Sequence, residues 1–266
     1  MSEFPSVPVW VSRYRAGSSL AESDHVAVEC PIALEYNGIS HAVMLASPSD
    51  VEDFALGFSL SEGVISKPQD LFDLEIRPAD AGLVVSLSIA AQQFDRLKTR
   101  RRSLTGRTGC GICGLEALEQ LAMRPAAIGN KQRLSRNSLV RAVSGLIDLQ
   151  PLQVQTGATH AAAWFNLYGD LQLVREDVGR HNALDKLIGA MAKARFSYAD
   201  GALLMTSRAS VEIVQKAATM GIGHIAAISA PTSMAVSLAR DCGVTLVGFL
   251  RGQDHVVYAH EADLAT

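Results

Sequence analysis

The stretch that decides the fold is residues 201–249, GALLMTSRASVEIVQKAATMGIGHIAAISAPTSMAVSLARDCGVTLVGF. It contains three short apolar runs separated by two segments whose apolar residues recur at helical spacing. The predicted strands are 202–206, 225–229 and 245–249, and the predicted helices are 211–220 and 234–241. Strands and helices that alternate at this spacing indicate parallel strands covered by helices. We therefore expect an α/β fold in this part of the chain.

The residues before this stretch predict further elements of both kinds. Strands 159–167 and 171–174 are expected to pair, followed by a helix at 181–194. Nearer the N-terminus, Asn37-Gly38 lies between two apolar runs, which is the strongest short-range signal of a β-hairpin. The other predicted elements are a helix from Val51, capped by residues 47–50, a strand at 83–89 and a helix at 92–102.

These elements predict an α+β protein overall, with three regions. A β-rich N-terminal region with helices covers 1–104, and a glycine-rich cysteine loop with its following helix covers 105–125. The α/β domain covers 126–266.

Composition excludes several classes of protein. The 266 residues carry 24 Lys+Arg and 27 Asp+Glu, a formal net charge of −3, and 48% of them are hydrophobic. These values are typical of a compact globular protein, and the lack of a basic excess argues against a nucleic acid as partner. No basic and apolar leader opens the chain, and no run approaches the roughly 18 apolar residues that cross a bilayer. We therefore expect a cytoplasmic protein without a membrane partner.

The motif with the most distinctive chemistry is GCGICG at residues 109–114, which places Cys110 and Cys113 before a predicted helix at 115–123. Free amides and the helix dipole at a helix N-terminus favour a thiolate, the nucleophilic form of cysteine. A basic run just upstream would lower a thiol pKa further or attract an anionic partner. Its members are Arg96, Lys98, Arg100, Arg101, Arg102 and Arg107. The pattern favours a reactive thiolate in this loop.

Other interpretations of the cysteine pair stay open. A structural zinc site needs four ligands and one Cys-x-x-Cys motif supplies two, so no metal site is assigned. A thioredoxin-like redox pair lacks its usual strand-to-helix surroundings, and cysteines are often simply buried. The basic run, taken alone, is more typical of a solvated helix face.

Two strand-to-helix turns, 205–210 and 229–233, are expected to meet at the carboxyl edge of the parallel strands, where α/β proteins usually bind ligands. The first turn contains Ser207 and Arg208, which suit a phosphate or pyrophosphate group together with free helix amides. Helix capping by Ser and Thr is the alternative explanation of each turn.

A further polar segment, REDVGRHN at residues 175–182, gathers ionisable groups between a strand and a helix. Glu176 and Asp177 suit acid–base roles, and His181 titrates near neutral pH. A salt-bridged, capped turn is the structural alternative. His160 is interpreted as a strand histidine whose hydrogen bonds are satisfied.

Near the C-terminus, residues 248–254 place an aromatic side chain and an arginine just past a predicted strand. Phe249 and Arg251 could stack on a nucleotide base and pair with a phosphate. Phe249 suits an ordinary core position equally well.

Taken together, these motifs resemble one family. They are SPSDVEDFALGF (47–58), SEG (61–63), GCGICG (109–114), GATHAAA (157–163), REDVGRHNALDKLIG (175–189) and TSRAS (206–210). The combination resembles the FdhD/NarQ family of formate dehydrogenase accessory sulfurtransferases, from about residue 28 to residue 258. The long block at 175–189 is the most specific part of this resemblance.

The resemblance implies a sulfurtransferase that accepts persulfide sulfur from a cysteine desulfurase and passes it to a bound molybdenum cofactor. That acceptor would be bis(molybdopterin guanine dinucleotide), destined for formate dehydrogenase. Cys110 would carry the persulfide, with Cys113 as its partner. The resemblance also implies a homodimer and a cytidine-deaminase-like, three-layer fold for the C-terminal domain.

The residues expected to bind the cofactor come from two segments. The family's C-terminal cofactor-binding segment corresponds here to Phe249, Leu250, Arg251, Gly252, Gln253 and Asp254, and the turn after the first parallel strand adds Ser207 and Arg208. We expect the family to be more basic at 253–254, and an acidic residue beside a phosphate would cost affinity.

Three functions follow from these patterns. The chain lacks the His-x-Glu and Pro-Cys-x-x-Cys motifs of deaminases, so deamination is not implied. Besides the sulfurtransferase, two alternatives remain. One is a non-catalytic chaperone that inserts the molybdenum cofactor, and the other is a zinc-dependent nucleotide hydrolase.

Overall fold

The computed structural model describes residues 5–105, 124–129 and 131–265. Cys110, Cys113 and the predicted helix at 115–123 lie outside the described residues, so the predictions made for them stay predictions. Within the described part of the chain, no helix is both long and apolar enough to cross a membrane.

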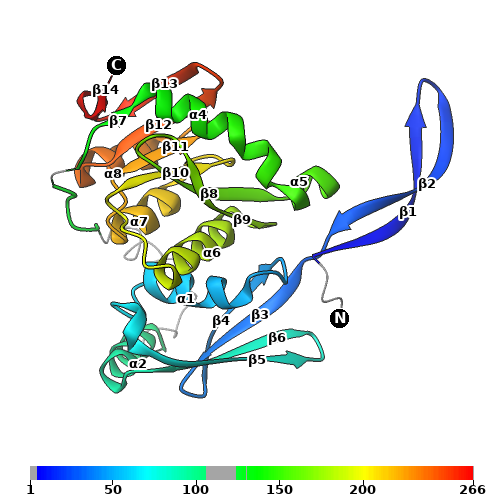
Figure 1. The fold of residues 1–266 in the computed structure, drawn as a ribbon. Helices are drawn as coiled ribbons and strands as arrows, with labels where there is room; N and C mark the ends of the chain where they lie inside the picture. The colour runs from blue at the N-terminus through cyan, green and yellow to red at the C-terminus, as the bar shows by residue number, and fades with distance from the viewer. Residues whose placement is uncertain (1–4, 106–123, 130, 266) are drawn as a thin grey trace.

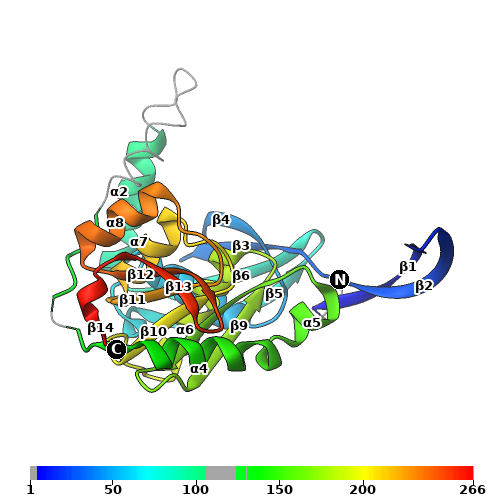
Figure 2. The same cartoon turned by 90° about the horizontal axis from the view of Figure 1, so that it is seen from above.

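The chain opens with a projecting two-stranded arm. Strands β1 (Ser6–Arg15) and β2 (Ser18–Ala27) pair antiparallel along their whole length. Both views show the arm extending away from the rest of the molecule (Figures 1 and 2). Its root is attached to the body where the Ser6 hydroxyl donates to Gln155, 2.8 Å away.

A four-stranded sheet follows, in the order β4-β3-β6-β5. Its strands are β3 (Cys30–Tyr36), β4 (Ile39–Ala46), β5 (Leu71–Ala79) and β6 (Gly82–Ile89). The predicted hairpin is confirmed, and both turn residues have positive φ, 47° at Asn37 and 79° at Gly38. The short η1 (Pro68–Asp70) leads into β5, which the sequence did not predict.

Two helices accompany this sheet, α1 (Val51–Ser61) and α2 (Ala91–Thr105), both near their predicted positions. The predicted cap of α1 is wrong. Asp50 lies in the left-handed region with φ of 52°, and its side chain makes no capping hydrogen bond. Ser47 instead accepts a hydrogen bond from the backbone N–H of Val178, so it links this turn to a distant part of the chain.

A six-stranded sheet forms the second half, in the order β13-β12-β11-β10-β8-β9. The strands are β8 (His160–Asn166), β9 (Leu171–Asp177), β10 (Gly201–Met205), β11 (His224–Ala227), β12 (Thr245–Arg251) and β13 (Asp254–Ala259). The β10, β11 and β12 strands are parallel, as predicted, whereas the flanking strands are antiparallel to their neighbours. The fold is therefore mixed α+β.

Helices cover both faces of this sheet (Figure 1). On one face lie α6 (Arg180–Lys193), α7 (Val211–Thr219) and α8 (Ser233–Cys242). On the other face α4 (Arg136–Leu146) packs on a second apolar cluster, followed by η2 (Ile147–Leu149) and α5 (Pro151–Thr156). Small β7 (Leu134–Ser135) and β14 (Leu264–Ala265) pair beside α4, and η3 (Glu261–Asp263) precedes β14.

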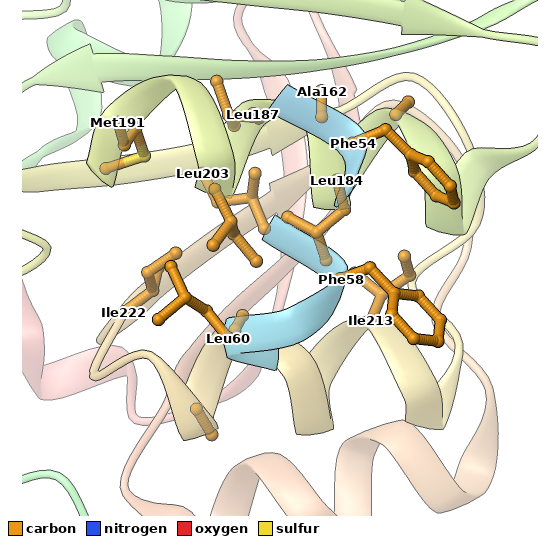
Figure 3. Close-up of a cluster of buried hydrophobic side chains, with 14 of the residues drawn as sticks. Phe54, Phe58, Leu60, Ala162, Leu184, Leu187, Met191, Leu203, Ile213 and Ile222 are labelled. Carbon is orange, nitrogen blue, oxygen red and sulfur yellow. The ribbon is translucent and has the colours of Figure 1, made fainter. Parts of the chain in front are cut away.

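One continuous core joins the two sheets through α1 and α6 (Figure 3). Phe54 and Phe58 of α1 lie in the same cluster as Leu184 of α6 and Leu203 of β10. The two helices approach so closely that a Cβ at Gly57 would lie 1.7 Å from the carbonyl oxygen of Asp185. This crossing fixes the N-terminal sheet relative to the larger one.

Candidate functional site

The carboxyl ends of β9, β10, β11 and β12 meet at one edge of the larger sheet, and β8 begins there. The two predicted turns are tied together at this edge. Ala209 and Pro231 form an isolated bridge, and the backbone N–H of Thr232 donates to the carbonyl of Ala209, 3.0 Å away. The structure thus confirms that the two turns lie side by side, as the parallel strands predicted.

Ser207 and Arg208 differ in exposure within the first turn. Ser207 is buried and its hydroxyl donates to the carbonyl of Arg208, 3.0 Å away, whereas the Arg208 side chain is exposed. Arg208 is therefore available to an anionic ligand, and Ser207 shapes the turn.

Phe249 lies beside the second turn in an unusual conformation. Its φ is 53°, in a region that bulky residues rarely occupy, and it is at a register irregularity between β12 and β13. Its backbone N–H donates to the carbonyl of Ser229, 3.1 Å away, and its side chain is 40% exposed. Phe249 is thus not a core residue. Its strained backbone presents an aromatic ring at the sheet edge.

The rest of the predicted cofactor-binding segment forms the tip of the β12–β13 hairpin rather than a tail past a strand. Arg251 and Asp254 pair across it, and the exposed residues are Arg251, Gly252, Gln253 and Asp254. Leu250 is fully buried in the core on the α4 side of the sheet, so only its backbone can contact a ligand. Gln253 and Asp254 also line an open cavity of about 500 Å³ along β13.

The acidic residues at the end of β9 have structural partners. Glu176 accepts hydrogen bonds from the backbone N–H groups of Leu152 and Gln153, at 2.9 and 2.7 Å, and so caps α5. The Asp177 carboxylate is wholly buried against the Lys186 ammonium, 2.7 Å away. These contacts favour the salt-bridged, capped turn over an acid–base role for either carboxylate.

His181, which follows these carboxylates in sequence, has only loose polar contacts. The Nε2 atom of His181 is 3.4 Å from Glu212 and 3.5 Å from the Ser210 hydroxyl. Burial, and then the positive charge of Arg180, lower the pKa of His181 below its ordinary value. The same two causes lower the pKa of His160 at the start of β8, so both rings are neutral at pH 7. His160 begins β8, as the sequence predicted, and none of the described residues forms a hydrogen bond with its half-buried ring.

A cavity of about 460 Å³ opens at this edge, between α5 and the start of β8. It is lined by Gln150, Gln153, Gly157, Ala158, Thr159, His160 and Thr206. Its volume lies within the range of small-molecule sites. Thr206 is held in the cavity lining by its hydroxyl, which accepts a hydrogen bond from the backbone N–H of Ala161, 2.8 Å away.

Comparison with known proteins decides the family. Residues 27–265 match the model of the FdhD/NarQ family. The chain belongs to this family. It is 55% identical over 250 residues to the sulfur carrier protein FdhD of Cupriavidus necator, covering 94% of this chain and 87% of that protein. The sulfur carrier protein FdhD of Bordetella petrii is 49% identical over 252 residues, covering 94% and 91%.

A solved member of the same kind has the same architecture. The crystal structure of a candidate formate dehydrogenase accessory protein from Desulfotalea psychrophila superposes with a TM-score of 0.77. It is 27% identical in sequence, and the match covers 98% of this chain and 99% of that one. The arrangement of sheets and helices described above is therefore shared with a solved protein.

In this member of the FdhD/NarQ family, the two described cysteines are poor candidates for sulfur chemistry. Cys30 in β3 and Cys242 at the end of α8 are both buried, and burial raises the pKa of each thiol. Arg124, which follows the cysteine pair in sequence, forms an ion pair with Asp241. This contact lies at the opposite end of α8 from Thr232, and hence at the opposite edge of the sheet from Phe249.

Sequence reasoning missed the wall of the cavity that α5 and β8 provide. Gln153 accepts a hydrogen bond from the backbone N–H of Thr159, 2.9 Å away, which closes the loop between them. The family block GATHAAA already contained Thr159 and His160. That motif was the signal in the sequence that could have identified the cavity wall, but its strand propensity alone assigned no functional role to Thr159 or His160.

Proposed function

We propose that this chain is a sulfur carrier that takes persulfide sulfur from a cysteine desulfurase in the cytoplasm and transfers it to a molybdenum cofactor for formate dehydrogenase. The observation that carries the proposal is the 55% identity, along 94% of the chain, to a protein named as a sulfur carrier. The similarity to a candidate formate dehydrogenase accessory protein supports the choice of client enzyme.

Cys110 accepts the sulfur in this proposal. Its thiolate attacks the terminal sulfur of the desulfurase persulfide, a new S–S bond forms on Cys110, and the desulfurase cysteine leaves as a thiolate. Burial raises the thiol pKa of both Cys30 and Cys242, which disfavours them as nucleophiles and supports the assignment to the 110/113 pair.

Cys113 completes the transfer. Its thiol attacks the inner sulfur of the Cys110 persulfide, which forms a Cys110–Cys113 disulfide and releases hydrosulfide to the acceptor. A cellular dithiol then reduces the disulfide and restores both thiols. In this scheme the two electrons that convert persulfide sulfur to sulfide come from the cysteine pair.

The acceptor is bis(molybdopterin guanine dinucleotide), bound as a substrate at the carboxyl edge of the larger sheet. Arg208 and Arg251 are exposed there and suit its phosphate groups, and the exposed ring of Phe249 suits a purine base. Ser207 shapes the first turn, and Gly252, Gln253 and Asp254 shape the tip of the β12–β13 hairpin. The order of the strands and the helices on both faces support a cytidine-deaminase-like layer as the scaffold of this site.

A second copy of the chain is the other partner in this proposal, and the arm supports it. Trp10 and Tyr14 are 82% and 78% exposed on a ribbon whose strands pair only with each other among the described strands. A two-stranded ribbon is marginal in water unless something packs on it.

The surface beside the root of the arm is apolar as well. Ile147, Leu149 and Val154 are exposed on η2 and α5. Two copies could bury both surfaces reciprocally, as a twofold interface requires. Each aromatic ring contributes about 150–250 Å², so the arm and this patch together approach the roughly 800 Å² per partner of a stable interface.

The alternative is a non-catalytic chaperone that binds and inserts the molybdenum cofactor. Such a protein needs the nucleotide-binding edge but no persulfide. The sulfur carrier and the chaperone can be distinguished by measuring how well variants activate formate dehydrogenase in cells that lack the native protein. We expect Cys110→Ala to abolish activation and Cys242→Ala to retain it, at equal protein levels. Full activation by Cys110→Ala would overturn the sulfur-carrier proposal.

A further inference from the structure

The four-stranded sheet has a helix on only one of its faces. Figure 1 shows α1 above the strands of this sheet and no helix below them. Ile32 and Leu34 of β3 are fully buried in the core that α1 shares. Because side chains alternate along a strand, Pro31, Ala33 and Glu35 point to the opposite, outer face. Among the described helices, none covers this outer face.

Five apolar side chains form one patch on the outer face, here called the outer patch. Its members are Pro31, Ala33, Val43, Leu45 and Val84. The strand register makes them neighbours, because Pro31 lies opposite Leu45, and Ala33 lies between Val43 and Val84. Val43 and Leu45 are 62% and 54% exposed. A solvated sheet face usually carries polar side chains at such positions, so the outer patch indicates a surface that binds a partner.

Acidic side chains border the outer patch at the end where β6 leads into α2. Glu35 of β3 and Asp73 and Glu75 of β5 occupy outer positions of the sheet. Arg77, also on this face, lies with its guanidinium 3.6 Å from the Glu35 carboxylate. None of the described residues forms an ion pair with Asp73 or Glu75. The border therefore keeps negative charge, which complements Lys or Arg side chains on a partner.

We propose that the outer face docks the sulfur donor of Cys110, a cysteine desulfurase, through an apolar surface of the donor that Lys or Arg side chains border. The inference rests on the proposed function, because it names the place where the donor of that function binds. It gives the N-terminal sheet a role of its own in the transfer of sulfur.

The course of the chain favours the donor over the acceptor as the occupant. β6 ends at Ile89 and α2 begins at Ala91, so α2 starts at the acidic end of the outer face. From the end of α2 at Thr105, five residues lead to Cys110, and five residues span at most about 18 Å. The acceptor is proposed at the larger sheet, and α1 and α6 lie between the two sheets (Figure 1). Donor and acceptor can therefore bind to different parts of the molecule.

The size of the outer face suits a transient partner better than a second copy of the chain. Four strands and the seven residues of β3 give a face of about 19 Å by 23 Å, or roughly 440 Å². A stable interface takes about 800 Å² from each partner, whereas transient encounters bury less. A sulfur donor has to dissociate after each transfer, and a small interface allows this.

The rate at which a cysteine desulfurase loads the full chain with sulfur tests the inference, measured by intact mass at increasing concentrations of the chain. In the double variant Val43→Ser, Leu45→Ser we expect the half-saturating concentration to rise about tenfold, because apolar docking contacts are lost. The maximal rate is expected to stay unchanged. Glu75→Lys is expected to slow loading at low salt and to matter less at high salt, since border charges act on the rate of association.

Two controls separate docking from the chemistry at Cys110. Glutathione persulfide is small and needs no docking surface, so it should load the wild type and the variants at equal rates. The double variant Tyr168→Ser, Met234→Ser changes two exposed apolar side chains away from the N-terminal sheet. The desulfurase should load this control like the wild type. Circular dichroism checks that each variant is folded.

An unchanged half-saturating concentration in Val43→Ser, Leu45→Ser, or an equal rise in the control variant, would overturn the inference. A lower sedimenting mass of Val43→Ser, Leu45→Ser than of the wild type would also overturn it, because the face would then be a contact between copies. Loading of the wild type by glutathione persulfide but not by the desulfurase would overturn the inference and leave Cys110 as a sulfur acceptor. No gain of sulfur from either donor would overturn the proposed function itself, so the two failures are distinguishable.

Discussion

Asp177 of β9 and Lys186 of α6 form a fully buried ion pair, with 2.7 Å between Oδ2 and Nζ. Lys186 also donates to the backbone carbonyl of Ser47, 3.1 Å away, so the pair ties the N-terminal region to the larger sheet. Its charges are stable only as a pair, because an unpaired buried charge is strongly unfavourable.

Lys186→Met is therefore expected to lower the free energy of unfolding by about 3–5 kcal/mol. Urea unfolding followed by circular dichroism measures this change. Arg141→Ala removes an exposed ion pair and is expected to cost no more than about 1 kcal/mol. Equal effects of the two substitutions would show that the buried pair has no special role.

The contact between α1 and α6 makes a second prediction. A Cβ added at Gly57 would lie 1.7 Å from the Asp185 carbonyl oxygen, so the helices would have to separate. Gly57→Ala is expected to destabilise the protein by at least about 3 kcal/mol. Gly129→Ala serves as the control, because nothing lies within 4 Å of its added Cβ. A thermal melt of Gly57→Ala that matches the wild type would refute the close crossing.

The parallel core of the fold was predictable because its signals are local. The apolar runs of β10, β11 and β12 are strand-length, and their helices carry apolar residues on one face. The arm was not predictable, since β1 reads like any half-buried strand. The alternation of Trp10 with Val9 and Val11 does not reveal that none of the other described strands pairs with the ribbon.

The candidate site, like the fold, was predictable from the sequence only in part. The sequence brought Ser207 and Arg208 to the sheet edge because parallel strands end together. It could not choose between roles for Glu176, because the amides that Glu176 caps lie more than 20 residues away. It also assigned Leu250 to the ligand, whereas the register irregularity in β12 buries that side chain.

The histidines at the sheet edge give a prediction about pH. Burial and the charge of Arg180 lower the pKa of His160 and His181, so their rings gain protons only below the ordinary value of about 6.5. Arg180→Ala removes one lowering cause, and both pKa values are expected to rise. An NMR titration of the ring signals measures them.

His224 is the internal control in that titration. Burial lowers its pKa as well, but the nearby cation is Lys131 rather than Arg180. Its pKa is expected to stay the same in Arg180→Ala. A shift of all three histidines, or of none, would contradict the effect of the Arg180 charge on His160 and His181.

The arm gives a prediction about assembly. Replacing Trp10 and Tyr14 with serine removes the two largest exposed apolar groups of the ribbon. If the arm holds a second copy, sedimentation should show a dimer for the wild type and a monomer for the double variant at the same concentration. Met234→Ser changes an exposed apolar residue elsewhere and is expected to leave the dimer intact. A monomeric wild type would exclude this interface.

The mass of the intact protein after incubation with a cysteine desulfurase and cysteine tests the central claim most directly. The account predicts that the wild-type chain gains one sulfur, about 32 Da, that a thiol reductant removes. Cys110→Ala should show no gain, whereas Cys242→Ala should gain sulfur like the wild type. No gain in the wild type, with an active desulfurase present, would contradict the account and favour the cofactor chaperone.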